Sequence, residues 1–194
     1  MPDTQQPTKD SSKDKGGTGQ DITGRSSRTV TVTVSAMLVA LGVMLSSLQG
    51  ILVIPIGDAK VFPAQSMINV ISGVMIGPWY GALVAFTISA IRYGLGLGTI
   101  FAFPGSIPGV VIVGLAYRYL WKNPAVGFLE ILGTGIIGAI LSSIIFAPLI
   151  SRSTPVAIFI AAFIPPSVIG SIIGFLILVT FKATVRKRVG LQFP

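Results

Sequence analysis

The chain lacks cysteine and histidine, and acidic residues are scarce. Without cysteine there are no disulfides and no thiol chemistry, and without histidine the commonest metal ligand and general base is missing. Only 6 of the 194 residues are Asp or Glu, and beyond residue 28 the only acids are Asp58 and Glu130. An enzyme needs a nucleophile with a base, a carboxylate pair or a metal site. These absences therefore argue against catalysis, against a metal site and against any need for a cofactor.

Two glycine patterns that would indicate nucleotide binding are also absent. The run "GLGLGT" at 94–99 has Thr99 where a dinucleotide fingerprint requires its third glycine, and no strand–helix–strand unit surrounds it. No phosphate-binding loop of the Walker type occurs either. The chain is therefore not expected to hydrolyse ATP by itself.

Apolar residues are what the chain has in excess. They make up 52% of the sequence, and charged residues only 10%, against about 25% in soluble domains. The net charge of +8 comes from bases at the edges of apolar runs rather than from a basic stripe mixed with aromatics. We therefore expect a multi-pass protein of the plasma membrane, in contact with the lipid bilayer and not with nucleic acid.

The two ends of the chain differ from the rest. Residues 1–28 are polar and rich in Gly, Ser and Thr, which predicts a disordered cytoplasmic tail. Residues 29–185 form the expected membrane domain, and residues 186–194 a short basic cytoplasmic tail.

Six apolar runs are bounded mainly by Gly and Pro. A helix needs about 20 apolar residues to cross the hydrocarbon layer. Two of the runs are short enough to form a re-entrant hairpin instead, with the turn "GPWYG" between them. We expect six true spans, at about 29–54, 62–76, 79–93, 106–121, 126–150 and 156–181.

The distribution of bases favours six spans and sets their direction. With six crossings, eight bases face one side and only Lys60, Arg92 and Arg152 face the other. Because basic residues are retained on the cytoplasmic side, both termini are predicted to be cytoplasmic. The larger set is Arg25, Arg28, Arg118, Lys122, Lys182, Arg186, Lys187 and Arg188.

Few polar side chains occur at membrane depth, and such residues usually face the interior of a bundle. Gln65 and Asn69 are four apart and share one helical face, where they bind either a ligand or a neighbouring helix. Arg92 is a ligand contact or extends to the outer headgroups. Glu130 is a ligand contact or forms a salt bridge with Arg118 or Lys122.

The segment "FAFPGSIPG" at 101–109 is apolar, yet Pro104 and Pro108 prevent a regular helix. Non-helical backbone near membrane depth persists only where protein or a cavity covers it. We therefore expect this segment to close one end of a ligand pocket. Flat rings could stack against Phe62, Phe101 and Phe103, and Ser106 could donate a hydrogen bond. An interfacial aromatic belt is the alternative for the three phenylalanines.

The order of three blocks, "AMLVALGVMLS", the long central stretch from "VFPAQSMINV" to "GSIPG", and "EILGTGIIGAI", resembles the substrate-binding S components of energy-coupling factor (ECF) transporters. Within that group the chain is most similar to the ThiW family, which is assigned to the thiazole precursor of thiamine. The resemblance covers about residues 33–185.

This resemblance implies an all-α bundle of six transmembrane helices with cytoplasmic termini. It implies uptake of a thiamine precursor, hydroxyethylthiazole, driven by a transmembrane coupling protein and two ATPase subunits. S components dock through an A-x-x-x-A motif on the first helix, which Ala36 and Ala40 match here. An S component for another vitamin, a membrane assembly or scaffold protein and an intramembrane enzyme stay open as alternatives.

Overall fold

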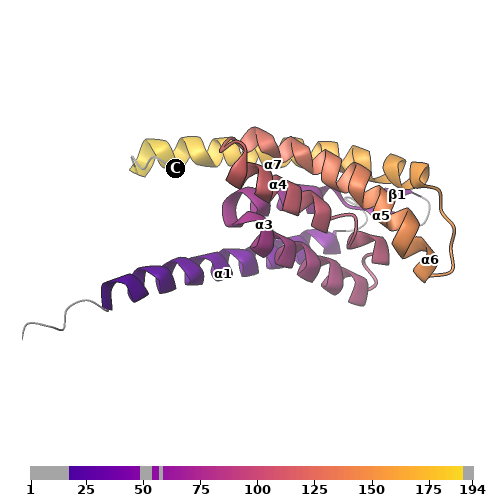
Figure 1. Cartoon of the computed structure of the whole chain (residues 1–194), viewed down its shortest axis with the longest axis horizontal. Coiled ribbons are helices and arrows are strands. Elements are labelled where there is room, and N and C mark those ends of the chain that lie inside the picture. Colours follow the sequence, from indigo (N-terminus) through magenta and orange to yellow (C-terminus); the bar gives the residue numbers. More distant parts are fainter. Residues whose placement is uncertain (1–17, 49–53, 57–58, 190–194) are drawn as a thin grey trace, which may run out of the picture.

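Long apolar helices make up most of the structure, and the computed structural model describes residues 18–48, 54–56 and 59–189 (Figure 1). Two short strands between the first two helices pair antiparallel, with Ile54 opposite Val61. The elements up to α4 are α1 (Thr18–Ser47), β1 (Ile54–Ile56), β2 (Ala59–Val61), α3 (Pro63–Gly94), η1 (Ile100–Ala102) and α4 (Ile107–Tyr119).

The next helical run, Pro124–Leu149, changes its winding several times. It begins with a 3₁₀ segment and contains two π-helical stretches, a form that is rare and often found at functional sites. A final long helix, α7 (Val156–Val189), completes the bundle. The run consists of η2 (Pro124–Leu129), η3 (Ile131–Gly138), α5 (Ala139–Leu141), η4 (Ser142–Phe146) and α6 (Ala147–Leu149).

Helix α3 is folded back on itself at Gly77. That residue has φ 82° and ψ −179°, which glycine adopts readily, and Pro78 follows it. The Arg92 guanidinium carbon lies 4.6 Å from the centre of the Phe62 ring. A straight helix would separate positions 62 and 92 by about 45 Å. The two limbs of α3, 63–76 and 78–94, are therefore antiparallel, with the turn at the predicted "GPWYG".

Five helical stretches of the described residues are long and apolar enough to cross a membrane. The two short apolar runs of the sequence are the two limbs of α3. Because α3 counts as one of the five stretches, five stretches correspond to the six expected runs. The start of α1 and the end of α7 lie at the same end of the bundle (Figure 1). The five stretches are Arg28–Ser47, Pro63–Gly94, Ile100–Tyr119, Pro124–Leu149 and Val156–Lys182.

Three boundaries differ from those expected. Helix α1 begins at Thr18, so residues 18–28, placed in the tail, are helical; residues 1–17 lie outside the described part. The same helix ends at Ser47 rather than at Ile54, which belongs to β1. Helix α7 continues to Val189, beyond residue 185. Hydropathy marks the part of a helix that lies in lipid, but a helix can extend beyond the apolar run because its backbone hydrogen bonds form within the helix.

Small residues let the helices approach closely. A Cβ added to Gly170 would lie 2.5 Å from the Pro63 carbonyl oxygen. One added to Gly133 would lie 2.5 Å from the Cα of Gly109, at the start of α4. Backbone contact of this kind is typical of helix pairs in lipid. These glycines hold α7 against α3, and η3 against α4.

Candidate functional site

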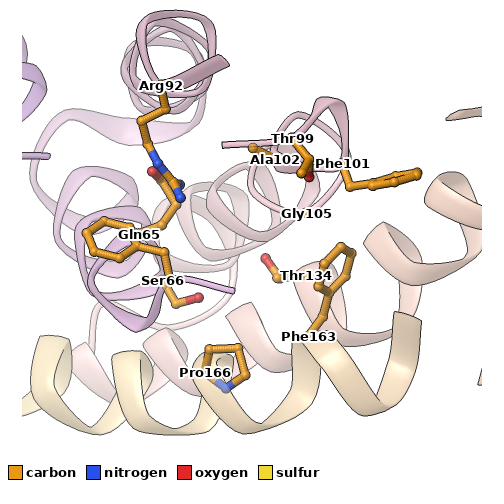
Figure 2. Close-up of a pocket in the computed structure, with 11 residues that line it drawn as sticks. Gln65, Ser66, Arg92, Thr99, Phe101, Ala102, Gly105, Thr134, Phe163 and Pro166 are labelled. Carbon is orange, nitrogen blue, oxygen red and sulfur yellow. The ribbon is translucent and has the colours of Figure 1, made fainter. Parts of the chain in front are cut away.

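A small cavity of about 40 Å³ lies between α3, the segment 99–105, η3 and α7. Figure 2 shows Arg92 and Gln65 on one side of it, and Phe163 and Pro166 of α7 across from them. The cavity is at the opposite end of the bundle from the turn of α3, because Arg92 and Phe62 lie at the far ends of the two limbs. Its lining is Phe62, Gln65, Ser66, Arg92, Thr99, Phe101, Ala102, Gly105, Thr134, Phe163 and Pro166.

The apolar segment with two prolines forms one wall of this cavity. Phe101 lies in the 3₁₀ turn η1, is 2% exposed, and packs against Phe159 with ring centres 4.7 Å apart. Gly105 is required at the next turn, since a Cβ there would lie 2.8 Å from the Phe101 carbonyl oxygen. The chain enters α4 only at Ile107. The non-helical backbone is therefore covered by protein and faces the cavity, as the sequence predicted.

A layer of buried polar side chains supports the wall. Asn69 Nδ2 donates to the Ser106 carbonyl oxygen and to Glu130 Oε1, each at 3.2 Å. Thr134 Oγ1 donates to the same carboxyl oxygen at 2.8 Å. Asn69, Ser106 and Glu130 are fully buried, while Thr134 reaches the cavity. The layer joins the first limb of α3, the start of α4 and the π-helical run.

Gln65 connects this layer to the cavity. Its Nε2 donates to Asn69 Oδ1 at 3.2 Å, which fixes the orientation of the Asn69 amide.

The second limb of α3 is bonded to the cavity wall as well. The hydroxyls of Ser89 and Ser106 are 3.1 Å apart, and both donate to the Ala102 carbonyl oxygen. The segment 99–106 is therefore bonded to the first limb of α3 through Asn69 and to the second through Ser89, and both side chains are buried.

Several buried polar atoms at the cavity or in the layer behind its wall have no hydrogen-bond partner among the described residues. They are Gln65 Oε1, Arg92 Nε and Nη2, and Glu130 Oε2. The hydroxyls of Ser66 and Ser167 lie close to the Glu130 carboxyl, but Ser167 Oγ donates to the Phe163 carbonyl oxygen at 2.6 Å. Buried polar groups are nearly always paired. Unpaired donors and acceptors around one cavity are therefore suited to a bound molecule.

Four of the eight residues expected at the site line the cavity: Phe62, Gln65, Arg92 and Phe101. Arg92 is 2% exposed, so the expected alternative of extending to the headgroups is wrong. It enters from the second limb of α3 and lies over the Phe62 ring.

The other four expected residues do not line the cavity. Three of them lie buried behind the cavity wall, where Asn69 donates hydrogen bonds to the Ser106 carbonyl oxygen and to the Glu130 carboxyl. Glu130 is fully buried, so the alternative of a salt bridge to exposed Arg118 or Lys122 is wrong. Phe103 instead packs on the outer face of the second α3 limb, with ring centres 5.4 Å from Phe86 and 6.4 Å from Tyr93.

Several lining residues were not expected from the sequence. Thr134 follows Glu130 by one helical turn, a spacing that could have indicated it. Phe163 and Pro166 come from α7, far along the chain from the other residues, and no local pattern marks them. The remaining unexpected residues are Ser66, Thr99, Ala102 and Gly105.

A helical bundle with a buried, partly polar cavity between its apolar helices is typical of membrane proteins that bind a small molecule. The model of a family described as "Thiamine-precursor transporter protein (ThiW)" matches residues 32–184. The chain therefore belongs to the ThiW family of thiamine-precursor transporters, and it is a multi-pass protein of the plasma membrane. Comparison with curated proteins and with solved structures gave no match.

Proposed function

We propose that this protein is the substrate-binding S component of an ECF importer and takes up a thiazole precursor of thiamine, such as hydroxyethylthiazole. A transmembrane coupling protein and two ATPase subunits would supply ATP hydrolysis. The single observation behind the proposal is the cavity with unpaired polar atoms in a chain whose residues 32–184 match a thiamine-precursor transporter family.

The orientation of the cavity supports import. We take the two limbs of α3 as separate crossings, which gives six spans and agrees with both described chain ends lying at one end of the bundle. The turn of α3 lies beside Arg118 and Lys122, which are both exposed. The positive-inside rule makes that end cytoplasmic. The cavity then faces the outside, where an importer meets its substrate.

The outer face of α1 supports a docking role. Ala36 and Ala40 are exposed, and so are Met37 and Met44, at 67% and 70%. The opposite face of the helix packs inward, because a Cβ on Gly42 would lie 2.5 Å from Ile88 Cδ1. A stripe of alanine on a lipid-facing helix allows the backbone of a partner helix to approach closely. We propose that this face binds the coupling protein.

The lining of the cavity suits a small heterocycle. Apolar faces come from Phe62, Phe101, Phe163 and Pro166, and a few polar atoms are placed between them. Such a combination is typical of small-molecule sites. The present volume of about 40 Å³ is far below the roughly 300–1,000 Å³ of ligand pockets, so binding requires the lining to move apart.

The proposal is tested in two steps. Small molecules released from the purified protein are identified by mass spectrometry, and uptake of labelled hydroxyethylthiazole is measured in cells with and without the coupling protein and ATPases. We expect a thiazole in the first measurement and uptake only with the partners in the second. Uptake without any partner, or binding of an unrelated vitamin, would contradict the proposal.

A further inference from the structure

The guanidinium of Arg92 is the only buried cation among residues 28–48 and 62–182, and two of its nitrogens are unpaired. It is 2% exposed and lines the cavity. Nε and Nη2 have no hydrogen-bond partner among the described residues. Arginine stays protonated in proteins, so this is a permanent positive charge. Burying such a charge without a partner is unfavourable.

The two free nitrogens form one edge of the guanidinium plane. The N–H bonds on this edge are nearly parallel, which is the arrangement that binds the two oxygens of a carboxylate or phosphate. A neutral ring nitrogen or a hydroxyl would satisfy only one of the two donors. The pattern of unpaired atoms therefore matches an oxyanion better than a neutral ligand.

No described carboxylate takes that place. Within residues 28–48 and 62–182, Glu130 is the only acid. Its Oε1 already accepts hydrogen bonds from Asn69 and Thr134, in the layer behind the wall. The face of the guanidinium rests on the Phe62 ring, with the carbon 4.6 Å from the ring centre. This contact fixes the plane while leaving the edge free.

The surroundings of Arg92 also indicate what the rest of the ligand carries. Figure 2 shows the guanidinium reaching toward Gln65, whose Oε1 is also unpaired and is a hydrogen-bond acceptor. Phe163 and Pro166 lie on the far side of the cavity. The complement of this lining is an apolar ring with an anionic group at one end and a hydrogen-bond donor beside it.

We propose that Arg92 binds an anionic group of the ligand through Nε and Nη2, so that the site selects a thiazole carrying a carboxylate or a phosphate over the neutral alcohol. The inference rests on the proposed function and makes Arg92 the residue that determines specificity. A charged precursor does not cross the hydrocarbon layer unaided, so it is the form that most needs a transporter.

The test compares three probes on the purified full chain by titration calorimetry: hydroxyethylthiazole, its phosphate monoester, and the corresponding thiazole acetic acid. At least one anion should bind roughly tenfold or more tightly than the alcohol, in keeping with the strength of charge-assisted bidentate hydrogen bonds. The comparison of the two anions shows whether the site takes the carboxylate or the phosphate.

Variants at Arg92 separate selectivity from folding. Arg92→Gln should remove the preference for the anion, because it lowers the affinity for the anions much more than the affinity for the alcohol. Arg92→Lys, which keeps the charge but loses the planar edge, should keep part of the preference. The matched control is Arg118→Gln, an exposed residue at the other end of the bundle, which should retain the full preference. If Arg92→Gln does not fold, the preference of the wild-type chain and Arg92→Lys decide the matter.

The outcomes distinguish this inference from the function on which it rests. If the wild-type protein binds the alcohol at least as tightly as both anions, or if Arg92→Gln weakens all three probes equally, the inference is wrong and the proposed function survives. If the wild-type protein binds none of the three probes, the proposed function fails and the inference fails with it.

Discussion

Asn69 and Glu130 are joined by a 3.2 Å hydrogen bond, although they are 61 positions apart in the chain, and both are fully buried. The bond connects the first limb of α3 to the π-helical run. Asn69 uses its second amide hydrogen on the Ser106 carbonyl oxygen. One side chain therefore holds three segments of the bundle together directly behind the cavity wall.

Replacing Asn69 with Leu should mainly lower the stability of the folded protein, because Asn69 does not line the cavity. The substitution leaves Glu130 Oε1 and the Ser106 carbonyl oxygen each without one donor. An unsatisfied buried group costs about 1–3 kcal/mol, and in membrane bundles the average is nearer 0.6 kcal/mol. We expect a clearly lower midpoint in thermal unfolding in detergent.

The control for this change is Thr87→Val. Thr87 lies on the same helix, and its hydroxyl donates to the Leu83 carbonyl oxygen one turn earlier. No other helix depends on that bond, so stability should change little. If both variants lower the midpoint of thermal unfolding equally, the contact between Asn69 and Glu130 does not stabilise the bundle more than a bond within one helix.

Gly133→Ala should separate η3 from α4. The added Cβ would lie 2.5 Å from the Gly109 Cα and 2.8 Å from its nitrogen, and neither backbone atom can move alone. Overpacking of this kind typically costs 1–3 kcal/mol. Because Glu130 and Thr134 lie on the displaced segment, thiazole affinity should fall together with stability. Gly94→Ala, where a Cβ meets nothing within 4 Å, is the matched control and should leave both unchanged.

Phe62 and Phe103 provide a matched pair for locating the site. Phe62 lies under the Arg92 guanidinium and lines the cavity, whereas Phe103 packs on Phe86 outside it. An aromatic ring contact with the ligand is worth about 0.5–1.5 kcal/mol, so Phe62→Ala should weaken ligand binding roughly 2- to 13-fold. Phe103→Ala should leave affinity nearly unchanged in titration calorimetry. The reverse result would move the site to the outer face of α3.

Ala36→Leu and Ala40→Leu should abolish ATP-driven uptake while preserving ligand binding to the isolated protein. Both positions are exposed on α1 and neither lines the cavity, so we expect bulk there to obstruct only an approaching helix. Ala161→Leu adds the same side chain to an exposed alanine of α7 and serves as the control. Binding that declines in parallel with uptake would assign the pair to internal packing instead.

Topology is tested with cysteines, which the wild-type chain lacks. A cysteine at Ser153 should react with an impermeant thiol reagent added outside the cell, and one at Asn123 should react only after the membrane is opened. Both positions are exposed in the structure. Labelling of Asn123 from outside would contradict six crossings and would make the hairpin of α3 re-entrant.

The helical segments and most of their limits could be predicted from the residues alone. Long apolar runs can satisfy their backbone in lipid only as helices, and Gly or Pro interrupts them, so the turn at Gly77 and the irregular segment before α4 could be located from the residues alone. The distribution of basic residues along the sequence likewise predicted that both termini are cytoplasmic. The blocks that resemble ThiW agree with the family match over residues 32–184.

Which polar residues face the cavity depends on how the helices pack and could not be predicted from the sequence. Periodicity shows that Gln65 and Asn69 share a face, but it does not show that Asn69 is covered by Ser106 and Glu130 while Gln65 reaches the cavity. The fold-back of α3 likewise turned Arg92 inward over Phe62. A helix fixes each side chain relative to its own axis. What that side chain meets depends on the neighbouring helices, whose distance is set by glycine contacts between segments remote in the chain.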